Sequence, residues 1–159
     1  MKILIVSDTH GHNSDLEKVL SKIAPIDALI HCGDVEGQEE HIEAIAGCPT
    51  YIVSGNNDYF SHLDREKEFT IAGYRILLIH GHNYGVTMTT ERILEEGRGR
   101  QANIVMFGHT HRPCLEQYED ITLLNPGSLS YPRQQGRRPS FMIMEIDQDN
   151  NVHYTTKFL

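Results

Sequence analysis

The chain has 159 residues, of which 39% are hydrophobic, and this length and composition suit a single domain spanning residues 1–159 with one core. Its 14 Lys+Arg and 22 Asp+Glu give a formal net charge of -8, so we expect no stable nucleic-acid complex. No run of the chain approaches the ~18 consecutive apolar residues of a membrane span, and the first apolar run is too short for a secretory signal, so we expect a cytoplasmic protein that does not bind membranes.

The first third of the chain alternates strand-like and helix-like segments. Continuous apolar runs, typical of buried strands, come at residues 2–6, 28–31 and 51–53. Apolar residues at helical spacing come between them, at residues 15–23 and 39–46. Asn13 or Ser14 is placed to cap the first helix, and Gly47 to end the second. This β-α-β-α-β order predicts parallel strands joined by helical crossovers.

The rest of the chain is dominated by strands. A hairpin is predicted from residues 69–71 and 75–79, a third helix at 89–96 and a further buried strand at 104–107. Four strand-like segments then follow without a helix between them, at residues 115–118, 122–124, 141–146 and 152–158. The pattern predicts a mixed α/β fold in which two sheets pack face to face with the helices outside.

The three cysteines, Cys32, Cys48 and Cys114, form no Cys-x-x-Cys pair. An odd number without such a pair argues against a disulfide framework and against a thiolate zinc site. We expect all three to be buried free thiols.

Five polar clusters come just after apolar runs of the chain. They are Asp8-Thr9-His10, Gly33-Asp34, Gly55-Asn56-Asn57-Asp58, His80-Gly81-His82 and Gly108-His109-Thr110-His111. Taken singly, each has an ordinary explanation as a solvated turn. Because the carboxyl ends of parallel strands share one edge of a sheet, where ligands bind, we expect the clusters to meet in space. The two histidines of the last cluster, one residue apart in an extended chain, should point the same way.

Ionisable side chains gathered in this way cost stability unless something compensates them, and a pair of metal ions would do so. The ordered set of motifs resembles the calcineurin-like metallophosphoesterase superfamily. Two further segments, 108–113 and 125–128, together with the short chain, resemble its small bacterial and archaeal phosphodiesterase branch. The resemblance covers residues 3–128 and implies a four-layer αββα sandwich of two mixed β-sheets packed face to face with helices outside.

The resemblance also implies a site with two divalent metal ions. One ion would be bound by Asp8, His10 and His111, the other by Asn56, His80 and His109, with Asp34 bridging both. The implied catalytic residues are Asp34, Asn56, His80 and His82. Ligands of oxygen and imidazole nitrogen suit Mn, Fe, Co, Ni or Zn, and we favour manganese.

Such a site predicts hydrolysis of a phosphate ester, with a metal-bridging hydroxide attacking phosphorus. Two divalent ions, two aspartates and a hydroxide leave a net charge of about +1, which attracts a small anionic substrate although the whole chain is acidic.

The position directly after Asn56 lacks a residue that can act as an acid, and this favours phosphodiesters as substrates. Many members of the superfamily carry histidine directly after the motif's asparagine, where it can protonate the leaving group. The chain has Asn57 there, which cannot act as an acid at neutral pH, although His82 or His12 could take over this role. His12 has an ordinary alternative as a solvated loop residue, and a phosphomonoesterase remains the alternative activity.

We expect Asn57 and Arg133 to contact substrate. Arg133 shares the irregular loop 128–139 with Arg137 and Arg138, which could grip phosphate or simply be solvated. Asp58 is either an acceptor that orients a neighbouring ligand or an ordinary turn residue.

Two other functions compete with a phosphodiesterase. One is a non-catalytic protein-binding scaffold, as in a retromer subunit of this superfamily with an altered metal site, although all seven expected ligands are present here. The other is a dinuclear hydrolase of a different ester or of an amide. Small relatives often self-associate, which allows a homodimer or a higher homo-oligomer.

Overall fold

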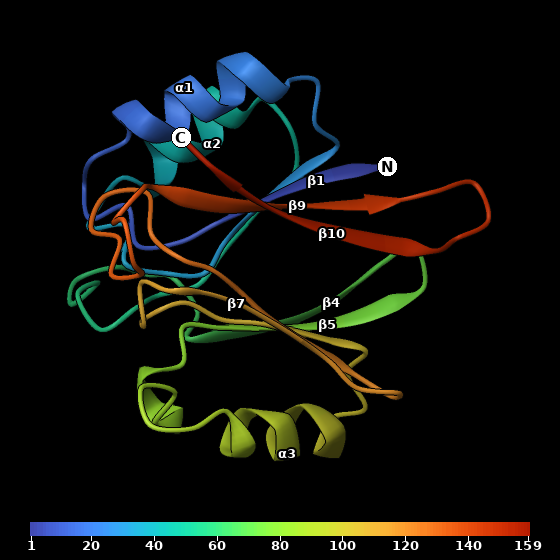
Figure 1. Cartoon of the computed structure of the whole chain (residues 1–159). Coiled ribbons are helices and arrows are strands. Elements are labelled where there is room, and N and C mark those ends of the chain that lie inside the picture. Colours follow the sequence, from blue (N-terminus) through green and yellow to red (C-terminus); the bar gives the residue numbers. More distant parts are fainter.

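The fold is built from two five-stranded mixed sheets that pack face to face (Figure 1). The computed structural model describes residues 1–159. The first sheet has the order β10 (Val152–Phe158), β9 (Ser140–Ile146), β1 (Lys2–Val6), β2 (Ala28–His31), β3 (Thr50–Ile52). The second has the order β4 (Glu66–Ile71), β5 (Tyr74–Ile79), β6 (Ile104–Met106), β8 (Thr122–Pro126), β7 (Pro113–Gln117).

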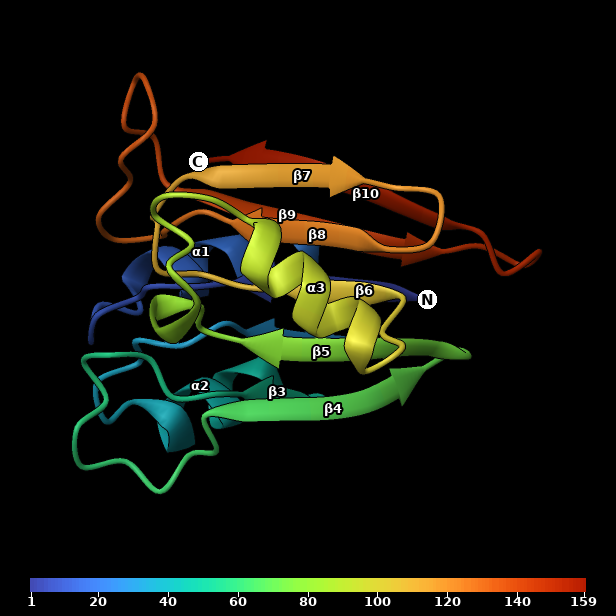
Figure 2. The same cartoon turned by 90° about the horizontal axis from the view of Figure 1, so that it is seen from below.

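Three α-helices form the two outer layers (Figure 2). Helices α1 (Ser14–Ile23) and α2 (Glu39–Ala46) lie on the first sheet, and α3 (Glu91–Gly99) lies on the second. A short 3-10 helix, η1 (His82–Tyr84), follows β5. The predicted four-layer αββα sandwich is confirmed. None of the helices combines the length and apolar character that crossing a membrane requires.

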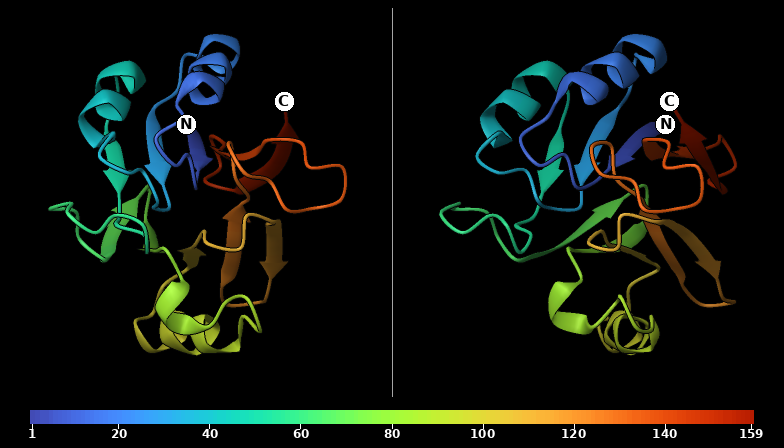
Figure 3. Two further views of the ribbon diagram at one scale, coloured as in Figure 1. Left: turned by 90° about the vertical axis from the view of Figure 1, so that its left-hand side faces the viewer. Right: turned by 60° about the vertical axis from the view of Figure 1, so that its left-hand side comes forward.

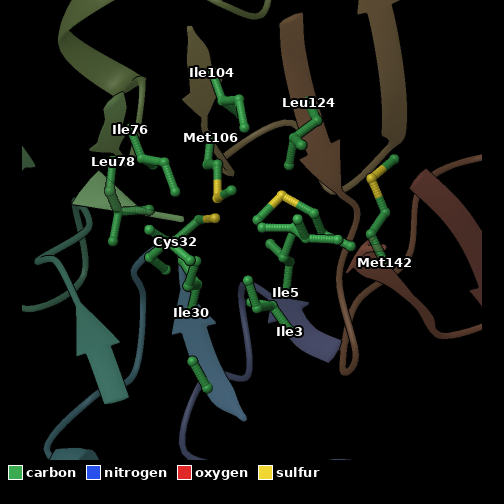
Figure 4. Close-up of a cluster of buried hydrophobic side chains, with 14 of the residues drawn as sticks. Ile3, Ile5, Ile30, Cys32, Ile76, Leu78, Ile104, Met106, Leu124 and Met142 are labelled. Carbon is green, nitrogen blue, oxygen red and sulfur yellow. The ribbon is translucent and has the colours of Figure 1, made fainter. Parts of the chain in front are cut away.

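The continuous apolar runs form strands because both faces of each sheet are covered. In β1, Ile3 and Ile5 point into the core between the sheets, whereas Leu4 packs under the helices of the first sheet. In β5, Ile76 belongs to the core between the sheets and Leu77 to the cluster under α3. Figure 4 shows the core between the sheets, where side chains from both sheets interdigitate. Burial on both faces explains why these strands lack alternating polar residues.

Parallel pairing directs several strand ends to one end of the molecule. In the first sheet β1 pairs with β2 and β2 with β3, all parallel. In the second, β5 pairs with β6 and β6 with β8, again parallel. Figure 3 looks toward the end where the carboxyl ends of these strands and the loops that follow them gather.

The predicted elements all form, with small shifts. Helix α3 begins at Glu91 rather than residue 89, and β4 begins three residues earlier than predicted. Ala72 and Gly73 form the hairpin turn with φ of 49° and 88°, a conformation suited to a two-residue hairpin. Asn13 precedes α1, yet neither it nor Ser14 makes a side-chain capping bond.

The cysteines are all free, as predicted, but they are not equally buried. Cys32 is fully buried, whereas Cys48 and Cys114 are only partly so. The expectation that all three cysteines are buried was therefore wrong for Cys48 and Cys114. Both lie near the outer layers rather than in the core between the sheets.

Candidate metal centre

Five loops bring the polar clusters together at the carboxyl ends of the strands. The loops follow β1, β2 and β3 in the first sheet and β5 and β6 in the second. The clusters therefore meet across the junction of two sheets, not along the edge of one. Hydrogen bonds tie the two sheets together here, since His80 Nδ1 donates to the carbonyl of Cys32 at 2.7 Å and the backbone amide of His109 donates to Asp8 Oδ2 at 3.2 Å.

One half of the site gathers two carboxylates and two imidazoles. Ligand atoms of Asp8, His10, Asp34 and His111 all lie within 4.8 Å of one another. Asp8 Oδ1 is 3.1 Å from His111 Nε2, which in turn is 3.3 Å from His10 Nε2. Asp34 Oδ2 lies 3.7 Å from His10 Nε2.

The other half gathers an amide and two imidazoles. Asn56 Oδ1 is 2.8 Å from His109 Nδ1 and 3.1 Å from His80 Nε2. His80 Nε2 lies 3.5 Å from Asp34 Oδ2. The same carboxylate oxygen of Asp34 thus faces both halves, the position that a shared ligand needs.

Three imidazoles are oriented from behind by oxygen acceptors. His80 Nδ1 is 2.7 Å from the carbonyl oxygen of Cys32, and His111 Nδ1 is 2.7 Å from that of Tyr131. His10 Nδ1 is 2.7 Å from Glu36 Oε1. A carbonyl or carboxylate oxygen accepts, so each Nδ1 donates its proton and each Nε2 faces the centre.

Carboxylate oxygens and imidazole nitrogens that can accept hydrogen bonds are gathered at a buried position in this centre. Asp8 Oδ1 is buried without a hydrogen-bond partner. An unpaired buried carboxylate oxygen beside imidazole lone pairs is unfavourable unless a cation binds them. The chemistry of the donors therefore fits divalent metal ions.

The pKa values of two buried groups reflect the pairing of carboxylates with an imidazole. Burial alone would lower the pKa of His80, but the carboxylates of Asp34 and Asp8 outweigh it and raise that pKa. Burial would raise the pKa of Asp34, but His80 and Asn57 outweigh it and hold that pKa well below the usual range. Both effects mean that positive charge is favoured between these side chains.

Five of the seven expected ligands adopt positive φ. The values are 53° for Asp8, 46° for His10, 59° for Asp34, 67° for His109 and 57° for His111. Positive φ is rare outside glycine and clusters at functional sites. The expectation that His109 and His111 lie on an extended chain and point the same way was therefore wrong: His109 faces Asn56 and His111 faces Asp8.

Asp58 is a structural anchor of the site rather than a solvated turn residue. Its buried carboxylate accepts backbone N–H groups of Asp34 at 2.9 Å, Val35 at 3.3 Å, Glu36 at 2.7 Å and Gly55 at 2.7 Å. It therefore fixes the loop that carries Asp34. Gly55 is required by the same packing, since a Cβ there would collide with Asp34.

The other predicted residues lie around this centre. Asn57 donates to Asp34 twice, from its backbone N at 2.8 Å and from Nδ2 at 2.7 Å, and it also lines a pocket beside the centre. The ring of His82 lies 5.4 Å from that of His80 and 6.1 Å from that of His109. Burial and the charge of His80 lower the pKa of His82. His12 is exposed, with Nε2 3.2 Å from Tyr131 Oη.

The arginines of the 128–139 loop divide into two groups. Arg133 and Arg137 line the pocket beside His10 and His111. Arg138 turns away and donates from Nε to the carbonyl oxygen of Leu159 at 3.0 Å. The expectation that these arginines could grip phosphate is therefore wrong for Arg138.

Several supporting contacts were not predicted. Glu36 holds His10, and the Ser128 hydroxyl donates to the carbonyl of Asp8 at 2.8 Å. Asn125 Nδ2 donates to the carbonyl of Gly108 at 2.7 Å and so fixes the turn before His109. The role of Glu36 could have been suspected from the sequence, because it lies two residues after Asp34. Backbone carbonyls that orient imidazoles leave no signal in the sequence.

A family model matches this arrangement along nearly the whole chain. Residues 1–149 match the calcineurin-like phosphoesterase superfamily domain. The chain belongs to this superfamily. Membership implies divalent metal ions, and the cluster around Asp8 and Asp34 is a site that could hold them.

The relatives carry names of the same kind. A probable metallophosphoesterase of Bacillus subtilis, YsnB, is 32% identical, with 94% of this chain and 86% of the relative covered. One from Methanothermobacter thermautotrophicus is 34% identical, covering 92% of this chain and 87% of the relative. The phosphodiesterase YfcE of Escherichia coli is 28% identical, covering 92% and 89%. The family supports a phosphoric ester hydrolase.

Solved structures share the fold. A predicted phosphoesterase from Streptococcus pneumoniae superposes with a TM-score of 0.81 at 24% identity, covering 99% of this chain and 97% of that one. Vps29 of Entamoeba histolytica, solved in complex with zinc, has a TM-score of 0.76 at 22% identity and 99% coverage of both chains.

Proposed function

We propose that this superfamily member is a dinuclear metal-dependent phosphodiesterase acting on a small anionic phosphate ester, and that residues 1–159 form one domain. The observation that carries the proposal is the position of Asp34 Oδ2, which faces His10 on one side at 3.7 Å and His80 on the other at 3.5 Å. A carboxylate placed in this way suits a bridge between two cations.

The other six expected ligands divide into two sets around that bridge. Asp8, His10 and His111 would hold one ion, and Asn56, His80 and His109 the other. When bound, the pair of ions supplies an activated water and offsets charge that develops on the phosphate. Manganese is our first choice, with Ni, Co, Fe or Zn as alternatives, because the donors are oxygen and imidazole nitrogen.

The chain's own residues would position these ligands and the substrate. Glu36 and the carbonyl of Tyr131 hold His10 and His111 in the orientation that presents Nε2. Asn57 keeps the Asp34 carboxylate in place through two hydrogen bonds, and both Asn57 and Arg133 border the space that the ester would occupy.

The site lacks an effective acid to protonate the leaving group, which favours diesters over alkyl monoesters as substrates. Asn57 cannot donate a proton as an acid at neutral pH. His82 lies close enough to be considered, but its pKa is lowered, so its protonated form is scarce at neutral pH. Substrates whose leaving group needs little help are therefore preferred.

A metal analysis paired with a substrate panel tests the proposal. The panel consists of an aryl phosphodiester, the matching aryl monoester and an aryl carboxyl ester, each assayed with Mn, Ni and Co. We expect two ions per chain and fastest turnover of the diester. Faster turnover of the monoester would identify a phosphomonoesterase, and turnover of the carboxyl ester alone would identify another hydrolase. No turnover of any of them would favour the protein-binding scaffold.

The Asn57→His variant tests the argument about the missing acid. An imidazole at this position can protonate a leaving oxygen, so we expect the ratio of monoesterase to diesterase activity to rise by roughly tenfold or more. The measurement is kcat/KM for the aryl monoester and diester of the same alcohol. An Asn57→Gln variant keeps an amide and serves as the control, and a ratio that rises equally in both would contradict the argument.

Removal of metal should lower thermal stability. Ions that bind only the folded chain stabilise it, and at a hundredfold excess over Kd the effect is about 2.7 kcal/mol. For a chain of this size that corresponds to a fall of roughly 5–10 °C in Tm after chelation. Differential scanning calorimetry with and without chelator measures it, and re-addition of manganese should restore the original Tm. An unchanged Tm would mean that no ion is coupled to folding.

A further inference from the structure

A large pocket adjoins the candidate metal centre and is lined by arginine. Its volume is about 770 Å³, and its walls include His10 and His111 on the side of the centre. Arg112, Arg133 and Arg137 are among the other lining residues, and no acidic residue lines the pocket. In a chain of net charge -8 this is a concentration of positive charge at one place.

The three guanidinium groups are not committed to the protein's own carboxylates. The arginine ion pairs of this chain belong to Arg98 and Arg100, which lie on and just after α3. Arg138, next to Arg137, is held by the carbonyl oxygen of Leu159 and lies over the ring of Phe158. The arginines that face the pocket therefore keep their donors free, unlike Arg98, Arg100 and Arg138.

The loop that carries Arg133 is anchored to the loops of the expected ligands. The backbone amide of Arg133 donates to the carbonyl of His111 at 2.9 Å, while His111 Nδ1 donates to the carbonyl of Tyr131 at 2.7 Å. Ser130 Oγ donates to the carbonyl of Thr9 at 2.6 Å. The base of the loop is thus fixed against the centre, and the residues beyond it reach outward beside this end of the molecule (Figure 2). Anchoring of the loop base limits the conformations of the backbone that carries Arg133, which lowers the entropic cost of binding an anion there.

The number of arginines exceeds what the scissile phosphate needs. A diester phosphate carries one negative charge, and two divalent ions would already face it. A terminal phosphate carries close to two charges and three acceptor oxygens, which guanidinium forks bind in pairs of hydrogen bonds. A pocket of this size also has room for an organic group between two phosphates.

We propose, resting on the proposed function, that Arg112, Arg133 and Arg137 form a subsite for a second phosphate group of the substrate. The preferred diester is then one that carries a terminal phosphate in addition to the diester phosphate that is cleaved, as a dinucleotide ending in a phosphate does. The subsite selects substrates by affinity and takes no part in bond cleavage.

Calorimetric titration of the manganese-loaded protein tests the subsite without requiring turnover. The ligands are thymidine 5′-monophosphate and thymidine 3′,5′-bisphosphate, which differ only in the second phosphate. We expect the bisphosphate to bind roughly tenfold or more tightly, a difference of about 1.4 kcal/mol. In Arg137→Gln and Arg133→Gln the advantage should fall below about threefold. Arg138→Gln makes the same charge change one residue away and should keep the full advantage.

The outcomes separate this proposal from the proposed function. Equal affinity of the two nucleotides for the wild-type protein would overturn the subsite, and so would an advantage that survives in both pocket variants. An advantage lost to the same extent in Arg138→Gln would also overturn it, because net charge alone would then be responsible. If the wild-type protein binds the bisphosphate more tightly, as expected, but does not hydrolyse the aryl diester, the result would instead count against the proposed function.

Discussion

Replacement of Asp34 by Asn is expected to lower turnover of an aryl phosphodiester by roughly two to three orders of magnitude. The carboxylate faces ligand atoms of both halves of the centre, at 3.7 Å from His10 Nε2 and 3.5 Å from His80 Nε2. An amide is isosteric but neutral, so it would bind both ions more weakly and leave positive charge between them uncompensated. Loss at one residue should therefore weaken both metal positions.

Two measurements show whether the effect acts through metal. The first is kcat/KM in manganese, and the second is the rise in Tm when manganese is added to the metal-free protein. We expect both to fall in Asp34→Asn. Asp120→Asn removes an exposed carboxylate that pairs with Arg98 at 2.8 Å and should change neither. Turnover close to that of the wild type would rule out a bridging role for Asp34.

The strands were predictable because their signal is local. Runs such as residues 3–6 and 76–79 are apolar at every position, and a strand buried on both faces favours such runs. The presence of two sheets also followed from the change of pattern, from alternating helices and strands to strands alone, but the addition of β9 and β10 to the sheet of β1 did not. Exact bounds such as the start of α3 depend on packing and were less well predicted.

The ligand residues were predictable as a set, but their geometry was not. The five motifs occur in an order that few unrelated chains would share, so their convergence could be expected. The positive φ of His109 and His111 could not, because it is imposed by the tight turn that also bonds Gly108 to His80 and Asn125. The expectation that residues 109–111 are extended was wrong for that reason.

Residues that act through the backbone remained hidden. The carbonyls of Cys32 and Tyr131 orient two imidazoles, and any residue type offers a carbonyl. The distinction between Arg137 and Arg138 was equally hidden, since adjacent arginines look alike in a sequence. The C-terminal carbonyl of Leu159 decides it by binding Arg138.

Replacement of Asp58 by Asn should cause the largest loss of stability among single changes near the site. Its carboxylate is 8% exposed and accepts four backbone N–H groups, three of them from the segment that carries Asp34. Hydrogen bonds to a charged acceptor contribute about 1.5–3 kcal/mol each, and an amide would present a donor to some of these N–H groups. We expect a loss of about 3–5 kcal/mol, which corresponds to a fall in Tm on the order of 10 °C.

Urea unfolding of the metal-free protein isolates this effect from metal binding. Asp64→Asn is the matched control, because Asp64 lies in the same loop, is exposed and pairs with Lys67 at 3.4 Å, so its loss should cost less than about 1 kcal/mol. Equal stability of the two variants would show that Asp58 does not anchor the loop. If Asp58→Asn remains folded below its lowered Tm, its metal affinity should also fall, since the position of Asp34 depends on the same hydrogen bonds. Asp34 has a positive φ, a backbone conformation that persists only when the surrounding structure stabilises it. The hydrogen bonds to Asp58 provide that stabilisation.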